Sequence, residues 1–175
     1  MYDILPDVSQ NLFDKSTIEY IQQLKEQHTG KRIGFTASTF DLIHPGHILM
    51  LEDAHSKVDI LIVALQTDPT IDRSSKNKPV QTYKERYIML NSIIYVDHII
   101  KYATTRSGDD QRSSTEDDLL NILKHLEPDL RILGSDWKGK AYTGHKLSIP
   151  VYFHERNHGW STSNLRKRVV EAENK

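Results

Sequence analysis

One run of nine residues, VDILIVALQ from Val58 to Gln66, constrains the fold more than any other stretch of the sequence. Nearly all of its side chains are apolar, several are β-branched, and they do not alternate with polar ones. A parallel strand that is covered by helices on both faces has this composition, whereas a strand with one face in solvent alternates apolar and polar residues. The run therefore predicts a buried parallel strand, which the rest of the chain has to cover.

Strand patterns and helical patterns alternate along the chain from Arg32 onward. Further strands are expected in RIGFTAS, DHIIKY, DLRILG and IPVYFHE, and helices in HPGHILMLEDAHSK, YKERYIMLNSI, EDDLLNILKHL and STSNLRKRVVEAE. This alternation is typical of right-handed β-α-β crossovers. We predict an α/β fold, a Rossmann-like open parallel sheet with helices on both faces, which would bind ligands at the carboxyl ends of its strands.

Residues 1–30 precede the alternating unit and are predicted to form an N-terminal helical extension. Within them, STIEYIQQLKEQ has the pattern of an amphipathic helix, and His28-Thr29-Gly30 ends it. A chain of 175 residues is long enough for one good core and short for two domains. We therefore expect residues 31–175 to form one domain on which the extension packs.

Charge and composition narrow the class of function. Lys and Arg number 23 against 24 for Asp and Glu, so the charge balance gives no electrostatic reason to expect a nucleic acid or an anionic membrane as partner. No apolar run approaches the length of a membrane span, and MYDILPDVSQ does not have the pattern of a secretory leader, so we expect a cytoplasmic protein. The absence of cysteine excludes a disulfide framework, a thiolate metal site and a cysteine nucleophile.

The stretch TFDLIHPGH directly follows the first expected strand and carries two histidines three residues apart. Pro45 suits the first turn of a helix, so His44 and His47 should face one side of that turn. The free backbone N–H groups and the positive end of the helix dipole lie at the same place, and Gly46 lets a ligand approach the backbone. Together these features predict a site for a phosphate chain.

A metal site is the alternative for a histidine pair at this spacing. Zinc would need further ligands, and the only carboxylates nearby at metal-ligand spacing are Asp41 and Asp53. We therefore favour phosphate over metal.

A second anion site is predicted at the start of the last helix, in GWSTSNLRKRV. Ser161, Thr162 and Ser163 place hydroxyls at the helix N-terminus, and Arg166 follows one turn later. Taken alone, this pattern would indicate simple capping. Two such N-termini, one after the first strand and one after the last, favour binding of an anion.

These two motifs resemble a known family. T-F-D-x-x-H-x-G-H after a buried strand is similar to the first signature of the nucleotidylyltransferases with an HxGH motif, and GWSTSNLRKRV is similar to their late S-T-T-x-L-R element. Such enzymes transfer a nucleoside monophosphate from CTP or ATP to a phosphate monoester and release pyrophosphate. The resemblance extends from Lys31 to nearly the end of the chain. It implies Mg²⁺ as cofactor, carried by the nucleotide without direct protein ligands, and a homodimer.

Within this family, three stretches resemble glycerol-3-phosphate cytidylyltransferase: ERYIMLNSIIYVDHII, GSDWKGK and RNHGWSTS. The resemblance implies transfer of a cytidylyl group from CTP to glycerol-3-phosphate or a related sugar or polyol phosphate, giving a precursor of a surface glycan. The start of the domain, GKRIGFTASTFDLIHPGH, also resembles the heptose-1-phosphate adenylyltransferase domain, which implies ATP instead. A catalytically silent nucleotide-binding module is a further alternative. A Rossmann-type dehydrogenase is disfavoured because the first strand-to-helix turn contains no GxGxxG.

Matched by position, the resemblance assigns three groups of site residues. The catalytic group comprises His44, His47, Lys78 and Arg156. The nucleotide-binding group comprises Thr39, Phe40, Gly46, Arg86, Asp136, Ser161, Thr162 and Ser163. The substrate-binding group comprises Lys76, Trp137, Arg106 and Arg112. Arg73 is an alternative to the two lysines, and Arg86, Lys76 and Lys78 would each, taken alone, be read as an exposed salt-bridge former.

Three departures from the family pattern bear on the identity of the acceptor more than on the type of reaction. Ser38 stands where the family usually has glycine, and Ile94 stands where a basic residue is common. The polar loop from Thr104 to Thr115 is longer than expected for a glycerol-phosphate enzyme. The expected reaction is in-line attack by an acceptor phosphate oxygen on the α-phosphorus, which needs no general base because the phosphate is already ionised at neutral pH.

Overall fold

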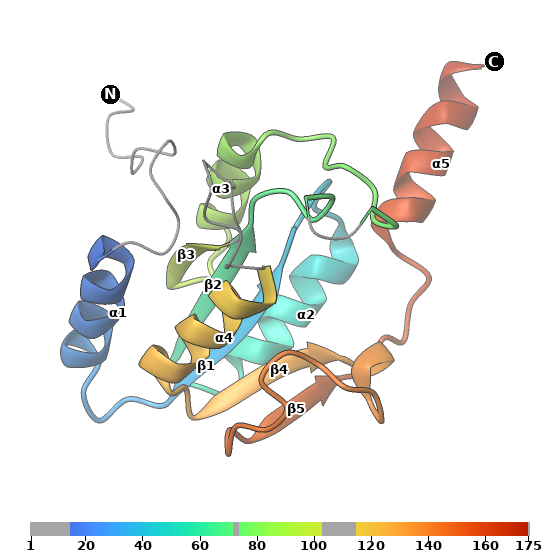
Figure 1. Cartoon of the computed structure of the whole chain (residues 1–175). Coiled ribbons are helices and arrows are strands. Elements are labelled where there is room, and N and C mark those ends of the chain that lie inside the picture. Colours follow the sequence, from blue (N-terminus) through green and yellow to red (C-terminus); the bar gives the residue numbers. More distant parts are fainter. Residues whose placement is uncertain (1–14, 72–73, 103–114, 175) are drawn as a thin grey trace.

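The computed structural model describes residues 15–71, 74–102 and 115–174. Its centre is a sheet of five parallel strands in the order β3-β2-β1-β4-β5 (Figure 1). The strands are β1 (Ile33–Ser38), β2 (Ile60–Gln66), β3 (His98–Tyr102), β4 (Leu130–Gly134) and β5 (Val151–His154). The predicted α/β class and parallel sheet are confirmed.

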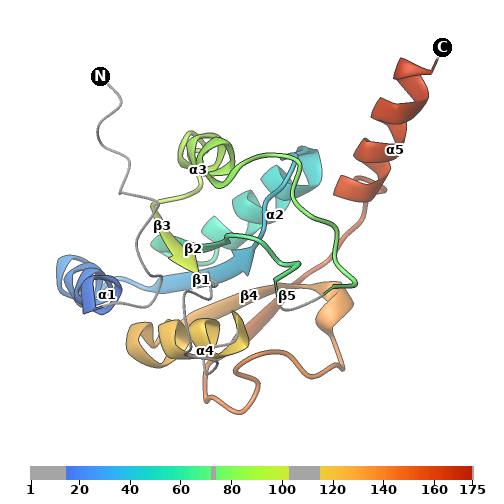
Figure 2. The same cartoon turned by 45° about the horizontal axis from the view of Figure 1, so that its top comes forward.

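Helices cover both faces of the sheet. The helices of the described segments are α1 (Lys15–Gln27), α2 (Pro45–His55), α3 (Tyr83–Asn91), α4 (Thr115–Leu126) and α5 (Thr162–Glu173), with a short 3-10 helix η1 (Ser135–Trp137). Figure 2 shows α2 and α3 on one face of the sheet and α1 and α4 on the other. The prediction of helices on both faces is therefore confirmed.

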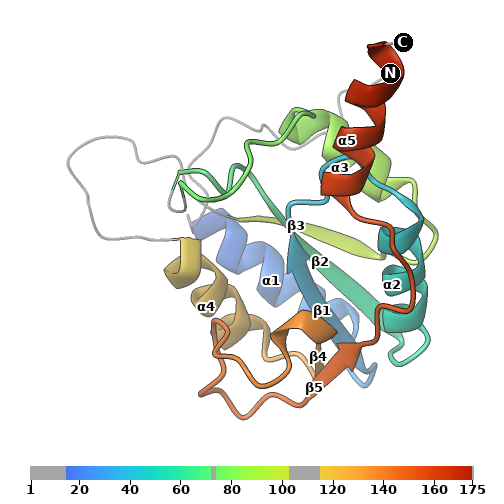
Figure 3. The same cartoon turned by 90° about the vertical axis from the view of Figure 1, so that its right-hand side faces the viewer.

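The last helix, α5, does not cover the sheet. It extends away from the carboxyl ends of the strands, as Figure 3 shows, and none of its residues is buried. Its first five residues bind the rest of the fold through hydrogen bonds from Thr162 Oγ1 to the carbonyl of Asp41 and from Arg166 to the Asp41 carboxylate. No helix among the described segments is both long and apolar enough to cross a bilayer.

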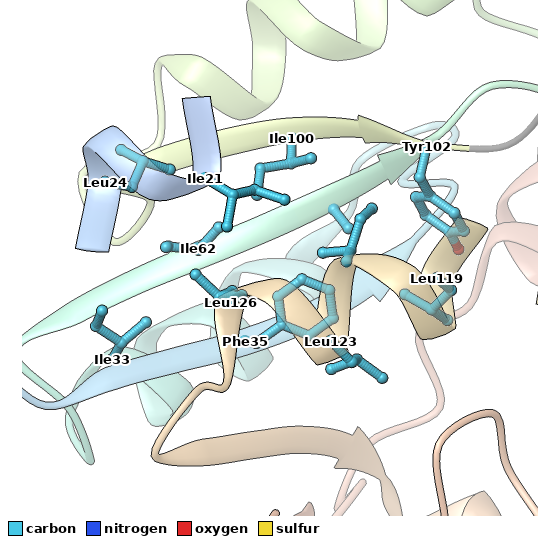
Figure 4. Packing of buried hydrophobic residues seen from close by; sticks show 12 residues of the cluster. Ile21, Leu24, Ile33, Phe35, Ile62, Ile100, Tyr102, Leu119, Leu123 and Leu126 are labelled. Atoms are coloured by element: carbon cyan, nitrogen blue, oxygen red, sulfur yellow. The ribbon is translucent and has the colours of Figure 1, made fainter. Parts of the chain in front are cut away.

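The N-terminal helix shares the core between the sheet and α4. Ile21 and Leu24 of α1 are buried against the sheet and α4, next to Phe35 and Ile62 of the sheet and Leu126 of α4 (Figure 4). Burying aliphatic side chains of this size stabilises a fold by about 1.5–3 kcal/mol each. Helix α1 is thus packed on the domain as expected, and the division at residue 30 stays a prediction.

Strand β2 shows why the sheet needs both layers. Ile62 and Ala64 face the core shared with α1 and α4, whereas Leu61, Val63 and Leu65 face the core shared with α2 and α3. All five side chains are fully buried. The apolar run from which the parallel strand was predicted therefore lies where both faces are covered.

The start of α3 follows its sequence signal closely. Thr82 Oγ1 accepts the N–H of Glu85 at 3.3 Å, and the Glu85 carboxylate accepts the N–H of Thr82 at 2.7 Å. This reciprocal pair is a capping box, which satisfies backbone donors that the helix itself leaves free. It fixes the direction in which α3 leaves the preceding loop.

The arrangement of strands defines where a ligand would bind. Strand β1 is central, with β2 on one side and the later strand β4 on the other, so the order reverses between β1 and β4. Open α/β sheets bind ligands at the carboxyl ends of the strands at such a switch point. The loop from Thr39 to His44 begins there.

Candidate functional site

The loop between β1 and α2 has an unusual backbone. Phe40 and Leu42 have φ angles of 48° and 49°, a left-handed region that L-residues other than glycine seldom adopt. Such conformations cost free energy and persist only where the surroundings hold them. His44 then takes an extended conformation as the N-cap residue, and α2 begins at Pro45 as predicted.

Asp41 holds this loop in place. Its carboxylate, 6% exposed, accepts the N–H groups of Val80 and Gln81 at about 3.0 Å and a bond from Arg166 at 2.6 Å. Burial alone would raise the pKa of Asp41, but these donors outweigh it and hold the pKa below its ordinary value. The same Arg166 nitrogen also donates to the carbonyl of Lys78 at 2.7 Å. Three segments far apart in the sequence therefore meet at one carboxylate.

Arg86 is buried, with an exposed fraction of 1%, and lies below the site. Its guanidinium donates to the carbonyls of Thr39 at 2.7 Å, Gln66 at 2.6 Å, Thr67 at 2.5 Å and Gln81 at 3.2 Å. Taken alone in the sequence, Arg86 is interpreted as an exposed residue that forms a salt bridge, and this interpretation is wrong. Its side chain is buried and binds the chain after β1, the end of β2 and the loop before α3. Its assignment to the nucleotide stays a prediction.

The two histidines of TFDLIHPGH stack on one another as the helical spacing predicts. The ring centroids of His44 and His47 are 4.0 Å apart with planes inclined by 20°, and the ring of Phe40 lies 5.3 Å from that of His47. His47 Nδ1 accepts the backbone N–H of His44 at 3.4 Å. A neutral imidazole with an accepting Nδ1 carries its proton on Nε2, so His47 has a donor left for a ligand.

Both histidines are held neutral. Burial lowers the pKa of His47 to about 3, with contributions from the neighbouring His44 and Arg156. Burial also lowers the pKa of His44, followed by the charges of Arg156 and His158. These shifts favour a role as hydrogen-bond donors rather than as cations in the free protein. The positive charge of Arg156 contributes to the lowered pKa of both rings.

The second predicted anion site lies beside the first. Ser161 caps α5, since its side chain accepts the N–H of Asn164 at 3.1 Å, and Thr162 Oγ1 donates to the Asp41 carbonyl at 3.1 Å. A cavity of about 460 Å³ separates the two helix starts. Its lining consists of His44, Gly159, Trp160, Ser161, Asn164, Leu165, Lys167, Arg168 and Glu171. The structure therefore brings the N-termini of α2 and α5 to one cavity.

An apolar cavity of about 430 Å³ adjoins the polar one and shares His44 and Trp160 with it. Ile43, Pro45, Ile48 and Leu49 form the rest of its wall. The site thus combines a polar part suited to phosphates with an apolar part.

The remaining predicted residues lie at the edge of this region or outside the described chain. Lys76 and Lys78 are exposed on the segment before α3, and Asp136 and Trp137 are exposed on η1, directly after β4. Arg73, Arg106 and Arg112 fall outside the described residues. Phe40 is 1% exposed, so any contact with a nucleotide would be through its backbone. Ser163 is exposed beside the Ser161 cap, and Thr39 Oγ1 donates to Gln66 Oε1 at 3.3 Å.

The resemblance placed the stretch from Arg156 to Ser163 at the nucleotide, but sequence reasoning gave His158 within it no role of its own. Its ring lies over Gly46, since a side-chain carbon added to that glycine would come within 2.5 Å of His158 Cε1. The ring of Trp160 is 5.1 Å away on the same segment. The i, i+3 spacing could reveal the pair on α2, but no local pattern links it to a histidine more than a hundred residues later.

Within the described ranges, no group of three or more His, Asp or Glu side chains is arranged to hold a metal ion. Apart from the Glu171 carboxylate, the polar side chains that line the cavity are the His44 imidazole, the Ser161 hydroxyl, the Asn164 amide and the cations Lys167 and Arg168. This set is suited to the oxygens of phosphate groups.

The model of the cytidylyltransferase-like family matches residues 35–168. The chain belongs to this family. The resemblance in its two signature motifs is thereby confirmed, and the family's match covers the β1–α2 loop, α3 and most of α5.

Curated relatives agree with this assignment. The bifunctional protein HldE of Campylobacter concisus (strain 13826) is 28% identical over 159 residues, which cover 90% of this chain and 31% of that protein. HldE of Campylobacter jejuni (strain RM1221) is 31% identical over 90% of this chain and 31% of its own length. HldE of Helicobacter pylori (strain HPAG1) is 30% identical over 85% of this chain and 30% of its own. The chain thus spans about a third of the length of these relatives.

Solved structures share the fold at lower identity. The lipopolysaccharide core biosynthesis protein of Thermoplasma volcanium GSS1 has a TM-score of 0.54 and 23% identity, over 75% of this chain and all of that one. Pantoate-beta-alanine ligase of Francisella tularensis, in a complex with beta-gamma ATP and beta-alanine, has a TM-score of 0.55 and 15% identity, over 85% and 70% of the two chains. At these identities the likeness establishes the fold alone.

Proposed function

We propose that the chain catalyses nucleotidyl transfer from a nucleoside triphosphate to a small phosphate monoester, with release of pyrophosphate. The observation that supports this most is the convergence of the N-termini of α2 and α5, with His44 and Ser161 as their N-cap residues, on one cavity. Helix N-termini and neutral imidazoles offer N–H donors to phosphoryl oxygens without the cost of moving charge into the site.

The proposed reaction is a single in-line displacement. An oxygen of the acceptor phosphate attacks the α-phosphorus, a new P–O bond forms, and the bond to the pyrophosphate oxygen breaks, its electron pair leaving with pyrophosphate. The protein positions the reactants and stabilises the charge on the α-phosphoryl group and the leaving group. His47 Nε2–H and Arg156 would supply most of this stabilisation, together with a lysine of the 76–78 segment.

The favoured donor is ATP and the favoured acceptor a sugar phosphate. The relatives given above are all HldE proteins, and the start of the domain resembles a heptose-1-phosphate adenylyltransferase domain. Both findings favour adenylyl transfer over cytidylyl transfer. The description "bifunctional", for proteins three times as long, fits a chain that corresponds to one of two activities.

Cytidylyl transfer from CTP to glycerol-3-phosphate or a related polyol phosphate is the second candidate. The residues that favour it are GSDWKGK, which includes η1, and RNHGWSTS, which joins β5 to α5. Both stretches lie at the carboxyl ends of strands, where they could contact a base or an acceptor.

Mg²⁺ fits this site only as part of the nucleotide complex. The carboxylate of Asp41 is already bound by two backbone N–H groups and Arg166, and the converging imidazoles are poor ligands for so hard a cation. When bound to the triphosphate, Mg²⁺ neutralises negative charge on the leaving pyrophosphate. The chain's own residues would then hold the phosphoryl oxygens that the ion does not.

We further propose that the protein is a cytoplasmic homodimer that has neither a nucleic acid nor a membrane as partner. Ile94, on the loop between α3 and β3, is 83% exposed, which suits an apolar contact with a second copy. Light scattering after size exclusion tests this: Ile94→Glu should shift a dimeric mass to the monomeric mass. A monomeric wild type would exclude the homodimer.

A donor and acceptor screen tests the reaction. Pyrophosphate release is measured for ATP, CTP, GTP and UTP, each with heptose-1-phosphate, glucose-1-phosphate, glycerol-3-phosphate, phosphocholine or phosphoethanolamine. We expect release with ATP and a sugar phosphate; release with CTP and glycerol-3-phosphate would support the second candidate. If no pair releases pyrophosphate although a nucleotide binds, the chain is a silent nucleotide-binding module.

A further inference from the structure

His158 lies on the segment between β5 and α5 and packs over the first turn of α2. A side-chain carbon placed on Gly46 would lie 2.5 Å from His158 Cε1, 3.0 Å from its Nε2 and 3.1 Å from His44 Cε1. The edges of two imidazole rings therefore meet above a residue without a side chain. The His158 ring also lies next to that of Trp160, with ring centroids 5.1 Å apart and planes inclined by 34°.

The nitrogens of His158 have nothing to bind within the protein. Both are buried and have no hydrogen-bond partner among the described residues, and the same holds for Nδ1 of His44. A neutral imidazole has one donor and one acceptor, and leaving them unsatisfied in a buried place is unfavourable. A phenyl or aliphatic side chain would fill the same space without that cost.

These three nitrogens lie next to the helix start that already points toward the cavity. His44 is buried, with an exposed fraction of 7%. It is the N-cap residue of α2 and lines the polar cavity together with Trp160. Such a concentration of unsatisfied imidazole nitrogens around a glycine indicates a ligand with several acceptor oxygens.

We propose that His158 is a third phosphate-binding imidazole of this site, which donates a hydrogen bond to the phosphate chain of the bound nucleotide beside His44 and His47. This assignment rests on the proposed function for the identity of the ligand as a nucleoside triphosphate. Trp160 packs beside the His158 ring. The phosphate oxygens would then accept an N–H that the free protein leaves unpaired.

Two substitutions distinguish phosphate binding by His158 from a role in which its ring only fills space. His158→Phe keeps the ring contacts with Gly46 and Trp160 but removes both nitrogens, whereas His158→Gln keeps a hydrogen-bond donor. His125→Phe on α4, on the opposite face of the sheet, is the matched control. Binding of ATP, CTP, inorganic tripolyphosphate and adenosine to each protein is measured by calorimetry, and the melting temperature is recorded without ligand.

Loss of one hydrogen bond to a charged group should weaken the binding of ATP and tripolyphosphate about tenfold in His158→Phe. Adenosine binding should not change, His158→Gln should recover most of the affinity, and the control should match the wild type. The melting temperature of His158→Phe should equal or exceed that of the wild type, since two unsatisfied nitrogens are removed.

The outcomes distinguish this inference from the proposed function. Unchanged or tighter triphosphate binding by His158→Phe would overturn the inference, as would a wild type that binds neither nucleotide nor tripolyphosphate. Binding that depends on His158 in a protein that releases no pyrophosphate would support the inference and contradict the proposed reaction.

Discussion

Arg166 of α5 and Asp41 of the β1–α2 loop, 125 residues apart, form an ion pair with a distance of 2.6 Å between Nη2 and Oδ2. The pair joins the helix that projects from the sheet to the loop that carries the two histidines. Since Asp41 also binds the backbone before α3, one carboxylate fixes the relative positions of α5, the β1–α2 loop and the segment that precedes α3.

Replacing Asp41 by Asn should destabilise the protein. The change keeps the shape but weakens the acceptor for two backbone donors and leaves Arg166 without its counter-charge, which should lower the free energy of unfolding by about 1–3 kcal/mol at pH 7. Urea unfolding measures this, with the exposed Asp136→Asn as control.

The destabilisation by Asp41→Asn should also depend on pH. Because the folded-state pKa of Asp41 lies below the ordinary 3.8, its ionised form stabilises the protein above that pH, and this contribution is lost as the pH falls through the folded-state pKa. The gap between wild type and variant should therefore narrow in urea unfolding at pH 3.5 and below. A gap that stays constant down to pH 2.5 contradicts the role given to the carboxylate.

Substitution of Arg86 should affect the stability of the protein more than its binding of a nucleotide. Arg86→Met removes the donors to four backbone carbonyls and should cost about 3 kcal/mol or more of unfolding free energy. Lys84→Met, exposed on the same helix, is the control and should have little effect. If Arg86→Met instead kept its stability and only weakened nucleotide binding, Arg86 would be a direct ligand of the nucleotide and not an anchor of the strand ends.

Substitutions at His47 should distinguish the roles of its two ring nitrogens. Asn can accept the His44 N–H in place of Nδ1, whereas Gln places an amide donor near the position of Nε2. We expect turnover to fall about a hundred- to a thousandfold in His47→Asn, the usual cost of one preorganised donor, and less in His47→Gln. Pyrophosphate release measures the rates, and His145→Gln, exposed in the sequence that follows η1, serves as control. Equal rates for Asn and Gln would argue against donation from Nε2.

His47 should remain neutral throughout the physiological range. With a folded-state pKa of about 3, its ring gains no proton between pH 8 and pH 5, whereas the unfolded chain does so near 6.5. Its contribution to stability is therefore complete above pH 6.5 and is lost as the pH falls toward 3. An NMR titration of the Cε1 proton should show no shift between pH 8 and 5; a midpoint near 6 would mean that His47 acts as a cation.

The fold followed from local patterns because buried parallel strands and capped helices have strong local signals. The apolar run of β2 and the Thr82–Glu85 capping box each correspond to a contact that the structure contains. The histidine pair was also local, since the spacing of His44 and His47 sets their stacking on the first turn of α2.

What the sequence did not reveal depends on long-range packing. Arg86 looks like any surface arginine of a helix until the ends of β1 and β2 bring their carbonyls around it. His158 belongs to a segment without helical or strand periodicity, and only the folding of β5 beside β4 carries it over Gly46. The left-handed backbone conformation of Phe40 and Leu42 could not be predicted from the sequence, because neither residue is glycine.

The most direct test of the account follows the α-phosphorus. With the donor and acceptor pair that the screen selects, α-³²P-labelled nucleotide is incubated with the wild type and with His47→Asn. We predict that the label appears in a product that joins the nucleoside monophosphate to the acceptor phosphate, in one-to-one ratio with pyrophosphate, and that His47→Asn forms it about a hundredfold or more slowly. Nucleotide that binds to the wild type yet never yields this labelled product with any acceptor would contradict nucleotidyl transfer by this site.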